Sequence, residues 1–316
     1  MHAQESNTRD APTMVQRARS VRERLFERTP ALGQASREHP AASLLPAFEA
    51  SDPFRGYGHL PESFVRICQR LNAGLGADAL SDFLQLLLVE LAEDFERRFA
   101  ASGLAEEFRA QFETSLRRML ERAAAPQSWR ASLSNDVFLK DLAIARQVLI
   151  PCISHLVYRH SGVPRRVVAR QRLTRLVRAA SYLLRAGGVR PFLENHVHLA
   201  MLEHFDPAGR ERCLRLVARL LELWPDSKGL IGASWYYDPG LGRISPKLAY
   251  LHDVPARQGA IFLRVGSRPE DVAGALVRSE TRRRLHQTGD YQPTSYLMVW
   301  ARADILRHYA RGSSPS

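Results

Sequence analysis

Three consecutive stretches decide the fold of this chain: VRPFLENHVH at residues 189–198, PAGRERCLRLVARLLEL at 207–223 and GLIGASWYY at 229–237. The outer two are short apolar runs of strand length, whereas the middle one repeats its apolar residues at helical spacing. A strand, a helix and a strand in this order are typical of a βαβ-like unit. These stretches therefore predict a sheet whose strands alternate with helices along the chain.

The same alternation extends on both sides of this unit. Short apolar runs predict further strands at residues 152–158, 260–265 and 294–300. Amphipathic patterns predict further helices at residues 137–150, 170–186 and 269–287. We therefore expect residues 135–312 to form one α/β domain, with a roughly five-stranded mixed sheet and flanking helices.

The residues before this domain are expected to lie outside the sheet. In residues 51–134, apolar side chains recur at helical spacing, as at Phe64, Ile67 and Leu71, which predicts a helical cap or bundle packed on the sheet domain. Residues 1–50 contain few apolar side chains and several prolines, so we expect a mobile arm whose removal leaves the fold intact. Within it, the highly charged residues 15–28 could form one docked helix. The predicted fold class is therefore α+β, or α/β, with a helical N-terminal part.

Composition limits the location and the partners of the protein. Of the 316 residues, 45% are hydrophobic, which is enough for a sizeable core, and no apolar run reaches the roughly 18 residues of a membrane span. No secretory signal is recognisable, and three widely spaced cysteines do not make a disulfide framework. We therefore expect a cytoplasmic protein with free thiols and no membrane partner.

The chain is strongly basic, because 45 lysines and arginines, of which 3 are lysines, stand against 33 acidic residues and give a formal net charge of +12. Such a charge raises the hypothesis of a nucleic-acid partner. Few aromatic residues accompany the arginines, and no zinc finger, clear helix-turn-helix or RNP motif is present, so nucleic acid is not the favoured partner. The preference for arginine over lysine is also typical of bacterial proteins from GC-rich genomes.

The first candidate site consists of Glu194, His196 and His198. On a strand, residues two apart project from the same face, so these three side chains would lie together. Two imidazoles and one carboxylate can hold a divalent metal ion and leave open positions for water or substrate. The alternative is a polar strand end whose histidines bond to the backbone or face water.

The second candidate site is a basic face. Residues 142–193 contain ten arginines and no Asp or Glu, and the guanidinium fork suits phosphate and carboxylate groups. We take as anion-binding residues Arg165, Arg166, Arg172 and Arg175. Two alternatives stay open, namely a solvated helix face and charge complementarity with residues 78–122, which are net acidic.

The third candidate lies near the C-terminus, where the strand AIFLRV at residues 260–265 runs into GSRPED at 266–271 and a long helix. This layout is similar to the cofactor-binding units of acyl-CoA-dependent N-acyltransferases, and the resemblance would imply an organic cofactor with its phosphates at the helix N-terminus. The glycine-rich phosphate loop of that family is absent, however. Ser267 and Glu270 also predict a capping box that occupies the free amides, so a self-capped structural helix is favoured.

These features lead to three hypotheses about function. The first is an enzyme of small-molecule metabolism that uses a divalent metal at Glu194, His196 and His198 to activate water, while arginines hold a small anionic substrate. The second is a non-enzymatic binding or scaffold protein that uses the arginine-rich face. The third is a cofactor-dependent acyl or group transferase.

Overall fold

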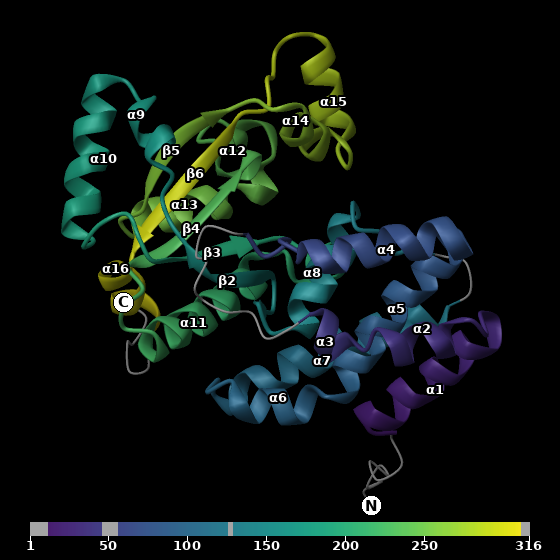
Figure 1. Ribbon diagram of the computed structural model, residues 1–316. Helices are drawn as coiled ribbons and strands as arrows, with labels where there is room; N and C mark the ends of the chain where they lie inside the picture. Colours follow the sequence, from purple (N-terminus) through teal and green to yellow (C-terminus); the bar gives the residue numbers. More distant parts are fainter. Residues whose placement is uncertain (1–11, 46–55, 126–128, 311–316) are drawn as a thin grey trace, which may run out of the picture. The chain divides into compact units, whose positions relative to one another are not determined.

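The computed structural model describes residues 12–45, 56–125 and 129–310, which divide into two compact units (Figure 1). The first unit is Met1–Ile150 and the second is Pro151–Ser316. We expected the sheet domain to begin at residue 135. The helix that starts there, α8 (Asp136–Ala145), belongs instead to the first unit, because Phe138 and Leu142 are among the side chains that it buries against other helices.

The first unit is a set of helices around a central one, α5 (Ala77–Glu93). The other helices are α1 (Met14–Arg28), α2 (Leu32–Glu38), α3 (Ala41–Leu44), α4 (Glu62–Leu75), α6 (Phe95–Ala101), the 3-10 turn η2 (Glu106–Phe108), α7 (Arg109–Ala124) and α8. Helix α5 buries every side chain of residues 81–89. A helix that is buried on all sides needs neighbours all round it, and α1, α2, α3, α4, α7 and α8 all contact it.

The segment expected to be a mobile arm is folded where the structure describes it. Helix α1 packs on α5 and buries Leu25 completely. Charged residues of α1 form ion pairs with α5, since Arg28 binds Asp82 and Arg22 binds Glu93. Sparse apolar residues and charges at helical spacing are therefore sufficient here for a docked helix.

The second unit contains a six-stranded mixed sheet, one strand more than the roughly five expected, and the α+β class is confirmed. Its strands are β1 (Leu149–Cys152), β2 (His155–Ser161), β3 (Phe192–His196), β4 (Gly229–Ser234), β5 (Ile261–Gly266) and β6 (Ser295–Ala301). The strand order is β1-β2-β3-β4-β6-β5. Strands β3 and β4 pair in parallel, and the pairs β2/β3, β4/β6 and β5/β6 are antiparallel.

Two predicted elements are each divided in the structure. The strand expected at residues 152–158 is interrupted by Ile153, whose φ of 61° lies in the left-handed region, so the chain forms β1 and β2 in its place. The helix expected at residues 269–287 is also two helices. A new one begins after Ser279, whose side chain accepts a hydrogen bond from the backbone N–H of Arg282. Local turn chemistry therefore overrides the longer periodic pattern at both positions.

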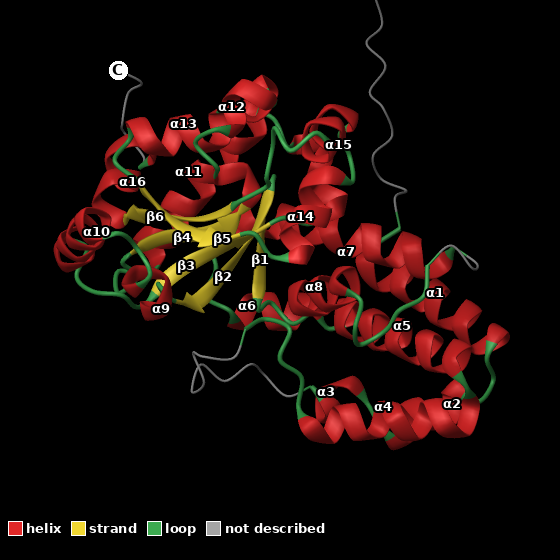
Figure 2. Ribbon diagram, turned by 90° about the horizontal axis from the view of Figure 1, so that it is seen from above, coloured by secondary structure: helices red, strands yellow, loops and turns green. Residues whose placement is uncertain are grey.

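Helices cover both faces of the sheet (Figure 2). The helical elements of this unit are α9 (Arg165–Ala169), α10 (Leu173–Arg185), η3 (Leu199–His204), α11 (Pro207–Leu223), η4 (Trp235–Tyr237), α12 (Leu241–Ile244), η5 (Pro246–Leu248), α13 (Tyr250–Arg257), α14 (Pro269–Leu276), α15 (Glu280–Gln287) and α16 (Arg302–Tyr309). Helix α10 packs on one face, and α11, α13 and α16 pack on the other.

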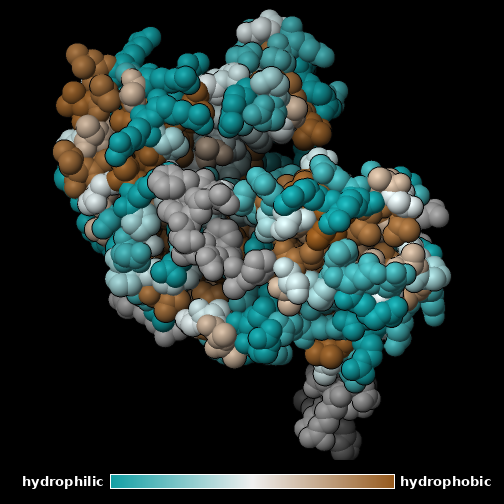
Figure 3. All heavy atoms as spheres, in the orientation of Figure 1, coloured by the Kyte–Doolittle hydropathy of each residue, from teal (hydrophilic) through white to brown (hydrophobic). Residues whose placement is uncertain are grey.

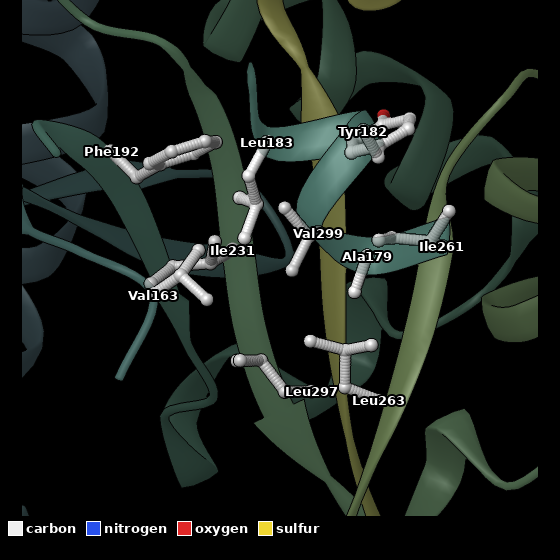
Figure 4. Close-up of a cluster of buried hydrophobic side chains, with 10 residues drawn as sticks. All are labelled: Val163, Ala179, Tyr182, Leu183, Phe192, Ile231, Ile261, Leu263, Leu297 and Val299. Atoms are coloured by element: carbon white, nitrogen blue, oxygen red, sulfur yellow. The ribbon is translucent and has the colours of Figure 1, made fainter. Parts of the chain in front are cut away.

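A cluster of buried apolar side chains lies beneath α10 (Figure 4). Ala179, Tyr182 and Leu183 of α10 meet strand residues that include Phe192 and Val299. The Tyr182 hydroxyl accepts a hydrogen bond from the backbone N–H of Ala301 at 2.8 Å, so its polar group is satisfied. The opposite face of the sheet is more polar, and it contains the candidate functional site.

Candidate functional site

The only parallel strand pair in the described sheet separates at its carboxyl end. Strands β3 and β4 pair at Leu193↔Leu230 and Glu194↔Ile231, whereas β4 continues to pair with β6 as far as Ser234. Residues 195–196 of β3 and 232–234 of β4, called the carboxyl edge below, therefore lie beyond the β3/β4 ladder. In open α/β sheets, ligands bind at the carboxyl ends of parallel strands where the connections diverge.

Asn195 fills the space between the two strands at this edge. Its amide lies directly over Gly232, where an added Cβ would come 1.7 Å from Asn195 Oδ1. The Asn195 side chain is buried, and its Nδ2 donates a hydrogen bond to the Tyr237 hydroxyl at 2.9 Å. Asn195 Oδ1 has no hydrogen-bond partner among the residues that the structure describes. A buried acceptor in that state is rare in native proteins.

Arg210 lies on the same face and is the central residue of the site. It belongs to the first turn of α11 and is only 2% exposed. Its Nη1 lies 3.3 Å from His155 Nδ1, and neither its Nε nor its Nη2 has a hydrogen-bond partner in the described parts of the chain. The neighbouring acid in sequence, Asp206, uses its side chain to cap α11 by accepting from the backbone N–H of Gly209 at 2.7 Å. Within residues 12–45, 56–125 and 129–310, no carboxylate therefore balances this buried cation.

His155 stands beside Arg210 at the start of β2 and is completely buried. Burial lowers the pKa of His155 well below its ordinary value, and the nearby Arg210 and His196 lower it further. The imidazole is therefore neutral at neutral pH and can accept one hydrogen bond while donating another. Ser154 Oγ lies 2.9 Å from His155 Nδ1 and is one of the groups that it can bond to.

Three tyrosines, Tyr236, Tyr237 and Tyr250, lie near enough to the guanidinium group of Arg210 to interact with it electrostatically. Burial raises the pKa of Tyr236 well above its ordinary value and raises that of Tyr250 to about 12, so both hydroxyls keep their protons. The rings of Tyr236 and Tyr237 stack edge to face with centroids 4.7 Å apart. The Tyr250 hydroxyl is buried and has no partner among the described residues. Protonated phenols can donate to an anion, and they do not neutralise the arginine.

This arrangement was not predicted, although the sequence contains one signal for it. Arg210 precedes Cys213, Leu214 and Val217 by three, four and seven residues, and these three form the buried stripe of α11. An arginine one turn before such a stripe, on the same face of the helix, is expected to be buried too. The tyrosines near Arg210 come from other elements, η4 and α13, and this local pattern does not reveal them.

The three residues of the predicted metal site do not form a metal-binding group. Glu194 and His196 share a face of β3, with His196 Nε2 3.7 Å from Glu194 Oε2, as the strand pattern requires. His198 lies beyond the end of β3, and its Nδ1 accepts from the backbone N–H of Ala200 at the start of η3. No group of three His, Cys, Asp or Glu side chains in the described chain could hold a metal ion. The i, i+2, i+4 rule fails here because the strand ends at His196.

The four predicted anion-binding arginines are exposed and lie on or next to two helices. Arg165 and Arg166 open α9, Arg172 precedes α10, and Arg175 lies in the first turn of α10. None of them forms an ion pair with a described residue. The acidic side chains of residues 78–122 have nearer partners, since Asp94 pairs with Arg97 and Glu96 with Arg109.

The predicted capping box of the C-terminal unit is absent. Helix α14 has Arg268 as its N-cap, with no side-chain hydrogen bond to the first turn. Ser267 Oγ instead lies 3.3 Å from Thr294 Oγ1. Arg268 pairs with Asp271 at 3.1 Å and Glu270 at 3.4 Å, so the acidic first turn is balanced by an arginine. Glu270 and Asp271, which would repel a phosphate, nevertheless lie in the first turn of α14 as predicted.

Comparisons with known proteins give no family for this chain. No protein-family model, curated protein or solved structure matches it significantly. In the residues that the structure describes, no helix has the length and apolar character needed to cross a membrane.

Proposed function

We propose that the second unit binds a small organic carboxylate at the carboxyl edge of β3 and β4, with Arg210 as its counter-charge. The observation behind this proposal is a guanidinium group that is 2% exposed, has two unused nitrogens and has no carboxylate partner among the described residues. Burying a charge without a partner costs several kcal/mol. A ligand anion would remove that cost.

The geometry of the unused donors favours a carboxylate. Nε and Nη2 lie along one edge of the planar guanidinium group, and their N–H groups form a fork that matches the two oxygens of a carboxylate. The protonated hydroxyl of Tyr250 supplies a further buried donor without a partner in the described chain. A phosphate would bring a second negative charge. The buried His155 beside Arg210 is neutral and adds no cation to balance that charge, so a carboxylate is favoured.

The exposed side chains of the carboxyl edge lie on the sheet face opposite Arg210. Glu194 and His196, 28% and 19% exposed, alternate with Asn195 along β3, and the exposed Ala233 follows Gly232 along β4. A ligand that reaches Arg210 would therefore have to enter on the Asn195 side of the edge.

This proposal retains the small anionic ligand expected from the sequence, but it assigns the counter-charge to Arg210 and no longer to the exposed arginines. The proposal concerns ligand binding alone and assigns no catalytic role to these residues. We also propose a cytoplasmic location, supported by three free cysteines that are all buried: Cys68, Cys152 and Cys213.

A differential scanning experiment on the full chain tests the proposal. Succinate, citrate and benzoate are titrated at constant ionic strength, with inorganic phosphate as a separate arm, and the melting temperature is recorded. A ligand at one hundred times its Kd stabilises by about 2.7 kcal/mol, which is several degrees for a unit of this size. We expect at least one carboxylate to raise the melting temperature of the wild type and to have no effect on Arg210→Met.

The matched control is Arg215→Met, which removes an exposed arginine of the same helix. It should respond to the carboxylate like the wild type. Without ligand, Arg210→Met should be as stable as the wild type or more stable, because an apolar side chain replaces an unpaired buried charge. The proposal is wrong if Arg210→Met keeps the response, if phosphate alone gives it, or if no carboxylate shifts the wild type.

A further inference from the structure

The ligand site at the carboxyl edge contains unpartnered polar groups of opposite kinds. Arg210 Nε, Arg210 Nη2 and the Tyr250 hydroxyl are buried donors without a hydrogen-bond partner in the described chain, whereas Asn195 Oδ1 is a buried acceptor in the same state. An ionised carboxylate can only accept hydrogen bonds. A ligand with no other polar group could therefore satisfy the donors but would leave the Asn195 oxygen unsatisfied.

Asn195 and Arg210 belong to the same interior site. Val157 of β2 pairs with Asn195 of β3, and His155 lies two residues before Val157, so His155 and Asn195 project from one face of the sheet. Arg210 Nη1 lies 3.3 Å from His155 Nδ1. The Tyr237 hydroxyl lies between the two groups in chemical terms, because it accepts from Asn195 Nδ2 at 2.9 Å and interacts electrostatically with Arg210. One ligand can therefore meet both the cation and the acceptor.

The orientation of the Asn195 amide leaves its oxygen for a ligand. The amide nitrogen is committed to the Tyr237 hydroxyl, and the oxygen rests over Gly232, where an added Cβ would lie 1.7 Å from it. Asn195 is 5% exposed, so bulk water does not solvate this oxygen freely. A buried acceptor without a donor is destabilising, and a donor on the bound ligand would remove that cost.

An uncharged donor suits this site better than an ammonium group. An ammonium group would place a second cation near Arg210, and none of the described carboxylates is among the groups that interact with that arginine. Buried charges without partners are costly, whereas a hydroxyl group donates a hydrogen bond and carries no charge. On the basis of the proposed carboxylate site, we infer that its ligand is a hydroxycarboxylate whose hydroxyl group donates to Asn195 Oδ1.

The exposed apolar surface of the second unit takes no part in this selection. Leu173, Val177 and Leu184 of α10 are exposed, and the hydrophobic surface over this helix is visible at the upper left of Figure 3. Helix α10 packs on the face of the sheet that carries Phe192, which is opposite the face of Asn195. The exposed side chains of α10 are therefore suitable positions for a control substitution.

Isothermal titration calorimetry of the full chain with a matched set of butyrates tests this inference. Butyrate is compared, at constant pH and ionic strength, with its 2-, 3- and 4-hydroxy derivatives, with 2-oxobutyrate and with 2-aminobutyrate. We expect at least one hydroxy acid to bind about fivefold or more tightly than butyrate, because it satisfies the buried acceptor. The oxo acid, which adds only an acceptor, and the amino acid, which adds a cation, should bind no more tightly than butyrate.

Two variants locate the source of the preference. Asn195→Leu removes the acceptor with little change in side-chain shape, so it should bind butyrate and the favoured hydroxy acid equally. Leu184→Asn changes an exposed residue of α10 and should keep the preference of the wild type. The comparison of ligands on the wild type decides the question even if Asn195→Leu folds poorly.

Several results would overturn the inference. They are a wild type that binds no hydroxy acid more tightly than butyrate, as expected if water occupies the acceptor, an equal gain from the oxo or amino acid, or a preference that persists in Asn195→Leu. If the carboxylates of the melting experiment still act through Arg210 in that case, only the hydroxyl assignment fails. If no carboxylate acts through Arg210, the proposed carboxylate site fails as well.

Discussion

Single residues at the carboxyl edge make the stability of the second unit dependent on pH. His155 is buried beside Arg210, and protonation of its ring would place a second positive charge in the same interior site. The pKa of His155 is therefore much lower in the folded state than in the unfolded state, where it is about 6.5. The folded state favours the neutral ring, so the stabilisation is complete above that pH and is lost as the pH falls below it.

This linkage predicts a measurable acid sensitivity. Between pH 7.5 and 5.0 the free energy of unfolding should fall, with His155 contributing up to about 1.4 kcal/mol for each pH unit below 6.5. His160 has its pKa lowered by burial in the same direction, so His155→Gln should reduce the slope without abolishing it. Calorimetry at pH 7.5, 6.5 and 5.5 measures both slopes. An unchanged slope in His155→Gln would show that its ring is free to protonate in the folded protein.

At the same scale, the chemistry of a side chain was easier to predict than its surroundings. The carboxylate of Glu194 and the imidazole of His196 lie together as their spacing on a strand requires. His198 has the same residue type but caps η3, because the strand ends two residues earlier. The metal hypothesis thus depended on where one element ends, which is the least predictable property of a strand.

At the scale of elements, the site depends on how closely β3 approaches β4. The Asn195 amide rests on the bare backbone of Gly232, and the hydrogen bond to Tyr237 holds it there. Any side chain at residue 232 would push Asn195 away from this position. Glycine is needed at this position because there is no space for a Cβ. The backbone conformation is not the reason, since residue 232 lies in an ordinary strand.

Gly232→Ala should therefore destabilise the second unit and weaken carboxylate binding together. Forcing an extra methyl group into a packed site costs roughly 1–3 kcal/mol. Gly74→Ala is the matched control, because a Cβ there meets nothing within 4 Å and lies within helix α4, where alanine is preferred. Urea denaturation should show a loss of stability for the first variant and none for the second. A Gly232→Ala protein as stable as the wild type would mean that Asn195 moves freely.

At the scale of the whole molecule, the N-terminal helices are part of the first unit and cannot be treated as an appendage. Helix α1 supplies buried Leu25 and the arginine that pairs with Asp82, a carboxylate on the central helix. Removing α1 would expose one side of α5 and leave that buried carboxylate without its partner. Loss of one member of such a pair is costly, because the other stays buried and charged.

Deletion of residues 1–45 should therefore abolish the cooperative unfolding of the first unit, in contrast to the expectation from composition. Leu25→Ala should lower its stability by roughly 2–5 kcal/mol, as for other buried leucines. The exposed change Glu23→Ala on the same helix should have little effect. Circular dichroism and calorimetry measure these changes. A truncated protein with an unaltered melting transition would restore the arm hypothesis.

The sequence by itself determined the class of fold and several of its longer helices and strands, because these follow from the local spacing of apolar residues. The α+β class, helix α11 and strand β4 could all be predicted without knowledge of distant contacts. Only the tertiary structure decided which charges are buried. Arg210, His155 and Tyr250 come from three separate elements, and their burial and mutual distances depend on how those elements pack. A local pattern carries no information about such neighbours, so the unbalanced cation at the carboxyl edge could be found only in the folded molecule.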